Sequence, residues 1–390
     1  MSEIKVNSIK GVGASSAAIT VNNTDGTCTV NNTQRQGRNL LTNGACVIAQ
    51  RGTDATGSAA NGYATVDRFR ADQSGTDAYI EQHQVDVASG TTPYAAGFRK
   101  AFQIKNGNQS SGAGTSDRVV IMYRIEAQDI ANSGWDYTSS SSYLTFSFYV
   151  KSSVAQNFYA DFRSYDGTGQ GYAIETGSLS ANTWTKVTKT IPGNSNLTFN
   201  NDTGVGLEIQ WTLYRGTDTT GTKSLNTWAA YNSSDRVPDM ASTWYTTDDA
   251  TFEITGIQLE VGSVATDFQF EDKNTTLRKC QRYFWRFGLV DSAWIFSGII
   301  AGSSQQARCL AKFPVPMRAN PTITYNDLVC DSEVSGSVET VNSVINTYFN
   351  SDFGGRVALG LAASSSASTG SPLNIYADSS SGYIQGDSEL

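Results

Sequence analysis

The feature that most constrains this chain is an alternation of apolar and polar residues with a period of two. In residues 143–151 every second residue is apolar, namely Leu144, Phe146, Phe148 and Val150, and the residues between them are Thr, Ser, Tyr and Lys. A helix would repeat its apolar positions every three or four residues. The alternation therefore predicts a β-strand with one buried face.

Similar segments recur along the chain, with Gly, Ser and Asn between them. Charged residues make up only 16% of the sequence, against roughly 25% in typical soluble proteins. This composition favours short strands with polar turns, so the predicted fold class is all-β. The middle of the chain offers ten candidate strands, at 65–71, 79–87, 98–105, 118–127, 143–151, 157–163, 172–176, 183–191, 206–214 and 250–260. That number predicts a jelly-roll β-sandwich.

The pattern divides the 390 residues into three parts. Residues 1–37 contain two short apolar runs around Asp25-Gly26, which predicts a β-hairpin. Because this segment cannot bury a core alone, we expect it to serve attachment or oligomerisation. Residues 38–272 form the predicted sandwich. Residues 273–390 form a smaller β-domain that opens with a short helical junction.

Within the last part, Leu277, Cys280 and Phe284 have helical spacing. The strands predicted after this junction are 293–300, 306–314, 322–325, 338–348, 357–362 and 371–378. The prolines of residues 313–325 alternate with apolar residues, which places them at an edge or at the start of a strand. One further short helix is expected near residues 127–133.

Two phrases bracket the sandwich. The first is NLLTNGACVIAQRGT at 39–53, followed by 62–69, and the second is FEITGIQLEVG at 252–262, followed by 266–270 and 280–284. We expect them to be its opening and closing strands. Both resemble the sugar-binding sandwich of tail fibres and related virion proteins of tailed bacteriophages. The N-terminal hairpin and residues 313–325 and 382–390 resemble parts of such fibres as well.

The resemblance implies a non-enzymatic virion protein, most simply a homotrimeric tail fibre. Residues 1–37 would bind other tail or neck proteins, and the sandwich would bind polysaccharide or lipopolysaccharide on the host surface. Trimerisation would strengthen a weak sugar contact through avidity. Two alternatives stay open: a decoration protein attached to the head or neck, and a polysaccharide depolymerase.

The charge and the cysteine content indicate which classes of partner and which compartment to expect. A net charge of -8 without a long basic run argues against nucleic acid. The five cysteines are widely spaced and are expected to be small buried hydrophobes of a protein made in the host cytoplasm. No apolar leader or membrane span is expected, so the protein would reach the virion without membrane insertion.

The sequence offers little for catalysis. His83 is the only histidine and lies in a candidate strand, where we interpret it as a surface residue. Asp161 with Asp166, or Asp248 with Asp249, could form a carboxylate pair. Turn formation is the favoured interpretation, with calcium binding and catalysis as alternatives. We predict no catalytic residue, no metal site and no cofactor.

Glycan binding is the favoured function, since sugars stack on aromatic rings and hydrogen-bond to polar side chains. Residues 215–249 form a long polar and aromatic segment, and long loops on rigid sandwiches often carry function. Trp184 is interpreted as mainly structural. The candidate glycan-binding residues are the loop aromatics Trp135, Tyr137, Tyr165, Trp228, Tyr231, Trp244 and Tyr245, each of which could instead be packed or lie in an interface.

Overall fold

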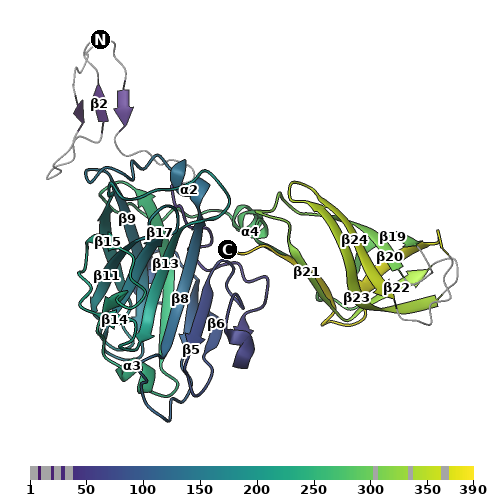
Figure 1. Ribbon diagram of the computed structural model, residues 1–390, viewed down its shortest axis with the longest axis horizontal. Helices are drawn as coiled ribbons and strands as arrows, with labels where there is room; N and C mark the ends of the chain where they lie inside the picture. Colours follow the sequence, from purple (N-terminus) through teal and green to yellow (C-terminus); the bar gives the residue numbers. More distant parts are fainter. Residues whose placement is uncertain are drawn as a thin grey trace. The chain divides into compact units, whose positions relative to one another are not determined.

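The computed structural model describes residues 8–9, 19–21, 28–30, 38–301, 306–332, 337–361 and 369–390. The chain divides into two compact units, Met1–Asn39 and Leu40–Leu390. Both are built from β-strands, and the described helices are short (Figure 1). The predicted all-β class is therefore confirmed. None of the helices in this part of the chain is long and apolar enough to cross a membrane.

The first unit contains a small antiparallel sheet of β1 (Ser8–Ile9), β2 (Ile19–Val21) and β3 (Cys28–Val30), in that order. Val21 pairs with Cys28, so two strands of the predicted hairpin are present. The Asp25-Gly26 turn between them lies outside the described residues.

The sandwich consists of two six-stranded sheets whose pairings are all antiparallel. Sheet I has the order β15 (Trp228–Ala230), β11 (Gln170–Ser178), β10 (Asn157–Ser164), β13 (Val205–Arg215), β8 (Arg118–Glu126) and β5 (Arg70–Ser74). Sheet II has the order β12 (Thr185–Pro192), β9 (Tyr143–Ser152), β17 (Thr251–Val261), β7 (Lys100–Lys105), β6 (Glu81–Asp86) and β4 (Asp54–Ala55). The chain crosses repeatedly between the sheets, as a jelly roll requires. Nine of the ten predicted strands are present with small shifts at their ends, and the prediction for 65–71 overlaps β5 only at Arg70 and Ala71.

Short elements fill the connections of the sandwich. They are the 3-10 helix η1 (Gly57–Ala60), the helices α1 (Thr92–Ala95), α2 (Ala127–Ala131) and α3 (Thr243–Thr246), and the parallel pair β14 (Thr220–Gly221) and β16 (Val237–Pro238). Helix α2 is the one that the sequence predicted.

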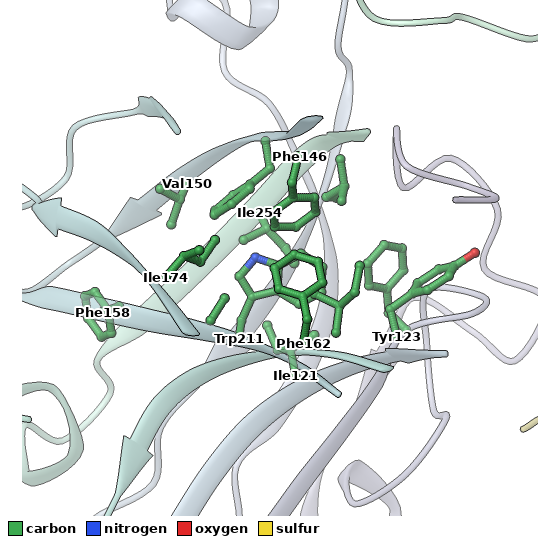
Figure 2. Close-up of a cluster of buried hydrophobic side chains, with 14 of the residues drawn as sticks. Ile121, Tyr123, Phe146, Val150, Phe158, Phe162, Ile174, Trp211 and Ile254 are labelled. Carbon is green, nitrogen blue, oxygen red and sulfur yellow. The ribbon is translucent and has the colours of Figure 1, made fainter. Parts of the chain in front are cut away.

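The core between the sheets is unusually aromatic. Figure 2 shows Trp211 of β13 among Phe146 and Phe162, with ring centroids of Phe146 and Trp211 5.6 Å apart. Phe148 meets the same indole at 5.8 Å, with the two rings perpendicular. The predicted alternation in 143–151 therefore directs its apolar side chains into this core. In sheet I, Phe162 of β10 and Trp211 of β13 point into the same core. The residues that alternate with them lie on the opposite surface of the sheet.

The first bracketing phrase differs from its prediction. Apart from β4, residues 39–55 form no strand. The backbone instead follows β17, with hydrogen bonds from Leu40 N to the carbonyl oxygen of Leu259 (2.8 Å) and from Ile257 N to that of Gly44 (2.9 Å). A regular strand is interrupted here because Asn43 and Cys46 both have left-handed backbones, with φ of 63° and 57°. Both phrases nevertheless contribute to one core, because Leu41 and Leu259 are buried in the same cluster.

The rest of the second unit contains α4 (Lys273–Gln281), a three-stranded sheet and a closed barrel. Asp272 caps α4 by accepting hydrogen bonds from Asn274 N and Thr275 N. The sheet has the order β18 (Phe284–Gly288), β26 (Tyr383–Asp387) and β21 (Thr322–Asn326). The barrel has the order β19 (Trp294–Ala301), β20 (Gln306–Lys312), β24 (Gly354–Leu361), β23 (Ser337–Asn350), β22 (Leu328–Ser332) and β25 (Pro372–Ala377). Strands β22 and β26 were not predicted.

Ion pairs join these elements to the sandwich within the second unit. Glu126 of β8 accepts hydrogen bonds from Arg282 Nε (2.7 Å) and from the Tyr283 hydroxyl (2.6 Å). The Arg68 guanidinium pairs with Glu389 and lies 3.4 Å from the Tyr283 ring centre. Sandwich and barrel thus belong to one compact unit. The domain boundaries expected at residues 37/38 and 272/273 remain predictions.

The described cysteines match their prediction. Cys46, Cys280, Cys309 and Cys330 are buried and form no disulfide. Burial raises the pKa of the Cys46 thiol to about 12, and it raises the pKa of Cys309 to the same value. These thiols are therefore protonated and unreactive at neutral pH. The side chain of Cys28 lies outside the described part.

Candidate functional site: the outer face of sheet I

Four of the seven predicted glycan-binding aromatics belong to the core. Trp135, Trp228, Trp244 and Tyr245 each expose 9% or less of their surface. The Trp244 indole donates a hydrogen bond to the carbonyl oxygen of Thr251 (3.1 Å). The Trp228 indole donates to the carbonyl oxygen of Pro192 (2.7 Å). The Tyr245 ring stacks on Tyr214 at 4.3 Å. These rings have no open face for a sugar, because the loops that carry them fold back onto the sandwich, so we withdraw them as candidates.

Tyr137 is half-buried and packs edge-on against Phe199, with ring centroids 5.0 Å apart. Its ring is thus used mainly for packing. The two remaining candidates, Tyr165 and Tyr231, are also half-buried, but they lie together on sheet I. They meet around one side chain that the sequence did not single out, Arg163. Its guanidinium carbon lies 4.2 Å from the Tyr165 ring centre and 3.8 Å from that of Tyr231.

The strand register places charged residues in rows across the outer face of sheet I, the face opposite the aromatic core. One row runs from Gly171 on β11 through Arg163 on β10 and Glu208 on β13 to Arg124 on β8. The next row contains Ala173, Asp161, Gln210, Met122 and Arg70. In both rows the positions on β10 and β13 are polar, so polar side chains cluster over these two strands.

Two carboxylates in these rows are buried and held by arginines. Asp161 exposes 4% of its surface and Glu208 1%. Arg236 donates twice to Asp161 Oδ2, from Nε at 3.1 Å and from Nη2 at 2.6 Å. Arg124 Nε donates to Glu208 Oε2 at 2.8 Å, and the Tyr165 hydroxyl donates to the same oxygen at 3.0 Å.

The ionisation of Glu208 follows from these partners. Burial alone would raise its pKa, but the nearby charge of Arg124 and the hydrogen bonds from Arg124 and Tyr165 together lower it below the ordinary value. The carboxylate therefore keeps its charge at neutral pH. Such a group can fix a hydroxyl or an arginine, but it has no proton to donate as a general acid.

Residues 216–240 cross this face. Strand β16 contacts β10, and Arg236 reaches Asp161 from this segment. Lys223 Nζ donates to the carbonyl oxygen of Gly171 at 3.4 Å, and Tyr231 N donates to that of Gly169 at 2.8 Å. The long polar segment noted in the sequence is therefore tied to the sheet, and it supplies Lys223, Tyr231 and Arg236 to the candidate site.

Several buried polar atoms of this face have no hydrogen-bond partner in the described part of the chain. They are Asp161 Oδ1, Arg163 Nε, Thr212 Oγ1, Arg215 Nε and Asp235 Oδ1. An unpaired buried donor or acceptor costs about 1–3 kcal/mol. A concentration of such atoms on one surface marks a place where a polar ligand or ordered water would complete the network.

The other candidates for chemistry lie elsewhere. His83 on β6 contacts Asp54 Oδ1 (2.7 Å) and Glu81 Oε2 (3.0 Å). Asp166 accepts two hydrogen bonds from Asn200 (2.9 and 2.8 Å), which ties two loops together, and Asp249 pairs with Lys105. Asp161 differs from its prediction, because it lies inside a strand rather than in a turn. Across the described ranges, no three His, Cys, Asp or Glu side chains gather as a metal site would require.

The sequence contained a signal for this face. In residues 158–165 the apolar Phe158, Ala160 and Phe162 alternate with Tyr159, Asp161, Arg163 and Tyr165. This alternation places the second set on the outer surface of the sandwich. The partnership of Asp161 with Arg236 spans 75 positions and cannot be inferred from spacing.

No protein-family model matches the sequence, and no curated protein matches it either. Among solved structures, the enzymatically active domain of tailspike protein 4 from Bacteriophage CBA120 is similar, with 10% identity and a TM-score of 0.31. The match covers 58% of this chain and 22% of that one. The N-terminal cellulose-binding domain of Cellulomonas fimi β-1,4-glucanase C has 11% identity and a TM-score of 0.27, covering 56% of this chain and 99% of that one.

A xylan-binding domain from Paenibacillus barcinonensis has 10% identity and a TM-score of 0.25, covering 50% of this chain and 87% of that one. This chain therefore spans less than a quarter of the tailspike domain and most of the two binding domains. At these TM-scores the ligands and activity of those proteins are not transferred to it.

Proposed function

We propose that the outer face of sheet I binds a glycan. The observation that carries this proposal is the arrangement of Tyr165 and Tyr231 around Arg163, beside unpaired buried donors and acceptors. The exposed parts of the two half-buried tyrosine rings offer apolar surface to a sugar ring. Asp161 Oδ1 accepts hydrogen bonds and Arg163 Nε donates them, which suits the hydroxyl groups of a carbohydrate.

The virion role is proposed on the sequence phrases that resemble tail fibres. In that role the protein is a non-enzymatic, homotrimeric tail fibre that attaches to polysaccharide or lipopolysaccharide on the host surface. Residues 1–37 bind tail or neck proteins. The barrel supports self-association, since its side chains Trp294, Leu310 and Phe353 are apolar and exposed.

Binding is tested with an array of host surface polysaccharides. Tyr231→Ala removes one ring beside Arg163 and is expected to weaken binding about tenfold, which corresponds to about 1.4 kcal/mol. Tyr79→Ala is the matched control, because Tyr79 is an exposed tyrosine just before β6 of sheet II. Equal binding by both variants would contradict the assignment of glycan binding to this face.

The non-enzymatic role is tested by incubating the protein with a polysaccharide that it binds and measuring new reducing ends. We expect none above background. Cleavage that is lost in Asp161→Asn or Glu208→Gln would establish a depolymerase instead, since paired carboxylates are the usual catalytic groups of glycosidases.

The location is tested by electron microscopy of virions that carry labelled protein. Label at the tail supports the fibre. Label confined to the head or neck would replace the fibre with a decoration protein.

A further inference from the structure

The cations on the outer face of sheet I are unequally partnered. Arg124 and Arg236 pair with the buried carboxylates Glu208 and Asp161. Arg163, Arg215 and Lys223 form no ion pair with any residue that the structure describes. Three cations of this face therefore have no ion-pair partner among the described residues, and the nearest carboxylates to Lys223 are Asp235 and Asp161.

Two of these cations lie next to Gly171, the one position in the row without a side chain. Gly171 pairs with Arg163 in the sheet register, and Lys223 Nζ reaches the Gly171 carbonyl oxygen. A Cβ atom at Gly171 would lie 3.5 Å from Lys223 Nζ and 3.8 Å from Tyr231. Because glycine has no side chain, Lys223 and Tyr231, and not a side chain of residue 171, fill the space beside Arg163.

The Arg163 guanidinium has the donors that bind a carboxylate or a phosphate. The tyrosine rings restrict its guanidinium, and its Nε is buried without a partner. A guanidinium held in this way loses little entropy on binding a carboxylate or phosphate and matches both in shape. Lys223 adds a second, compact positive charge.

The cost of burying Arg215 and Lys223 is only partly offset within the protein. Arg215 Nη2 donates to the neutral Gln210 side chain at 2.7 Å. Burial, reinforced by the charge of Arg236, lowers the pKa of Arg215 to about 10, although Asp161 acts in the opposite direction. Burial also lowers the pKa of Lys223, against the influence of Asp235 and Asp161. An additional negative charge at this place would stabilise all three cations.

We infer that the ligand of this face carries an anionic group, a carboxylate or a phosphate, which binds between Arg163 and Lys223. This inference rests on the proposed function and specifies its ligand as an acidic glycan. Hydroxyl groups next to the anion donate to Asp161 Oδ1, and the sugar ring lies against Tyr165 or Tyr231.

The experiment measures thermal unfolding of the full chain with sodium glucuronate, sodium phosphate or glucose, at equal concentration and with ionic strength equalised by sodium chloride. Ligands that bind the folded state raise the unfolding midpoint. We expect glucuronate or phosphate to raise it and glucose to have a much smaller effect. A response to glucuronate indicates a uronic acid, and a response to phosphate alone indicates a phosphorylated glycan.

Arg163→Gln and Lys223→Gln should each abolish most of the anion-dependent shift. Lys186→Gln is the control, since Lys186 is an exposed lysine on β12 of sheet II, and it should keep the full shift. The inference is overturned if no anion exceeds glucose, or if the two variants respond like the control. If host polysaccharide still binds in a Tyr231-dependent manner, only the anionic preference has failed. If that binding is also absent, the proposed function has failed with it.

Discussion

At the residue scale, Glu126 shows how one buried carboxylate depends on its neighbours. It is fully buried on β8 and accepts hydrogen bonds from Arg282, Tyr283 and Gln128. Burial opposes its ionisation, but the bonds from Arg282 and Tyr283 outweigh burial and lower its pKa. A carboxylate with a lowered pKa stabilises the folded state when it is charged.

Glu126→Gln should therefore reduce the free energy of unfolding at pH 7 by about 1.5–3 kcal/mol, as expected for hydrogen bonds to a charged group. The deficit should be constant above the ordinary glutamate pKa of about 4.3. It should shrink as the pH falls through the lower, folded-state value, where the wild-type side chain is protonated as well. Denaturant unfolding at several pH values measures this, with the exposed Asp136→Asn as control. A deficit that does not change with pH would contradict the account.

At the element scale, the segment 216–249 determines which aromatics can meet a ligand. Trp228, Trp244 and Tyr245 lie in or beside this segment's short strands and α3, and all three pack into the sandwich. A sequence pattern can place a residue between two strands, but it does not show whether the connecting segment covers the core or extends into solvent.

The strands of the sandwich could be predicted because their alternation is local. The site could be predicted only in part, since Arg236 and Lys223 reach it through long-range folding.

Trp244→Ala tests the structural role of that segment. Removing a fully buried indole should destabilise the protein by about 3–5 kcal/mol. Tyr79→Ala is the matched control, because Tyr79 is 55% exposed and its loss should change stability by no more than about 0.5 kcal/mol. Thermal or denaturant unfolding distinguishes them, and similar losses in both variants would contradict the assignment of Trp244 to the core.

Asp387, the last residue of β26, and Glu389, which follows that strand, give a second test at this scale. Glu389 pairs with the buried Arg68, whereas Asp387 is 40% exposed and pairs with Arg51. Glu389→Ala leaves a buried guanidinium without its partner and should cost about 3–5 kcal/mol. Asp387→Ala breaks a more exposed pair and should cost less than about 1 kcal/mol. Equal costs in unfolding measurements would show that Arg68 finds another partner.

At the scale of the whole molecule, the proposed fibre requires self-association. The isolated chain has a mass of 41.9 kDa, and we expect three copies to sediment together. Exposed apolar side chains on the barrel favour such an interface. Sedimentation equilibrium measures the mass directly. A stable monomer at micromolar concentration would contradict the trimer, while leaving glycan binding by one chain unaffected.

The central claim is that the outer face of sheet I is the glycan site. The most direct test is a crystal structure of the protein with an oligosaccharide from a host polysaccharide that it binds. The account predicts a sugar ring against Tyr165 or Tyr231, with an acidic group between Arg163 and Lys223. Sugar density on the barrel or on sheet II, with the Arg163 region unoccupied, would contradict it.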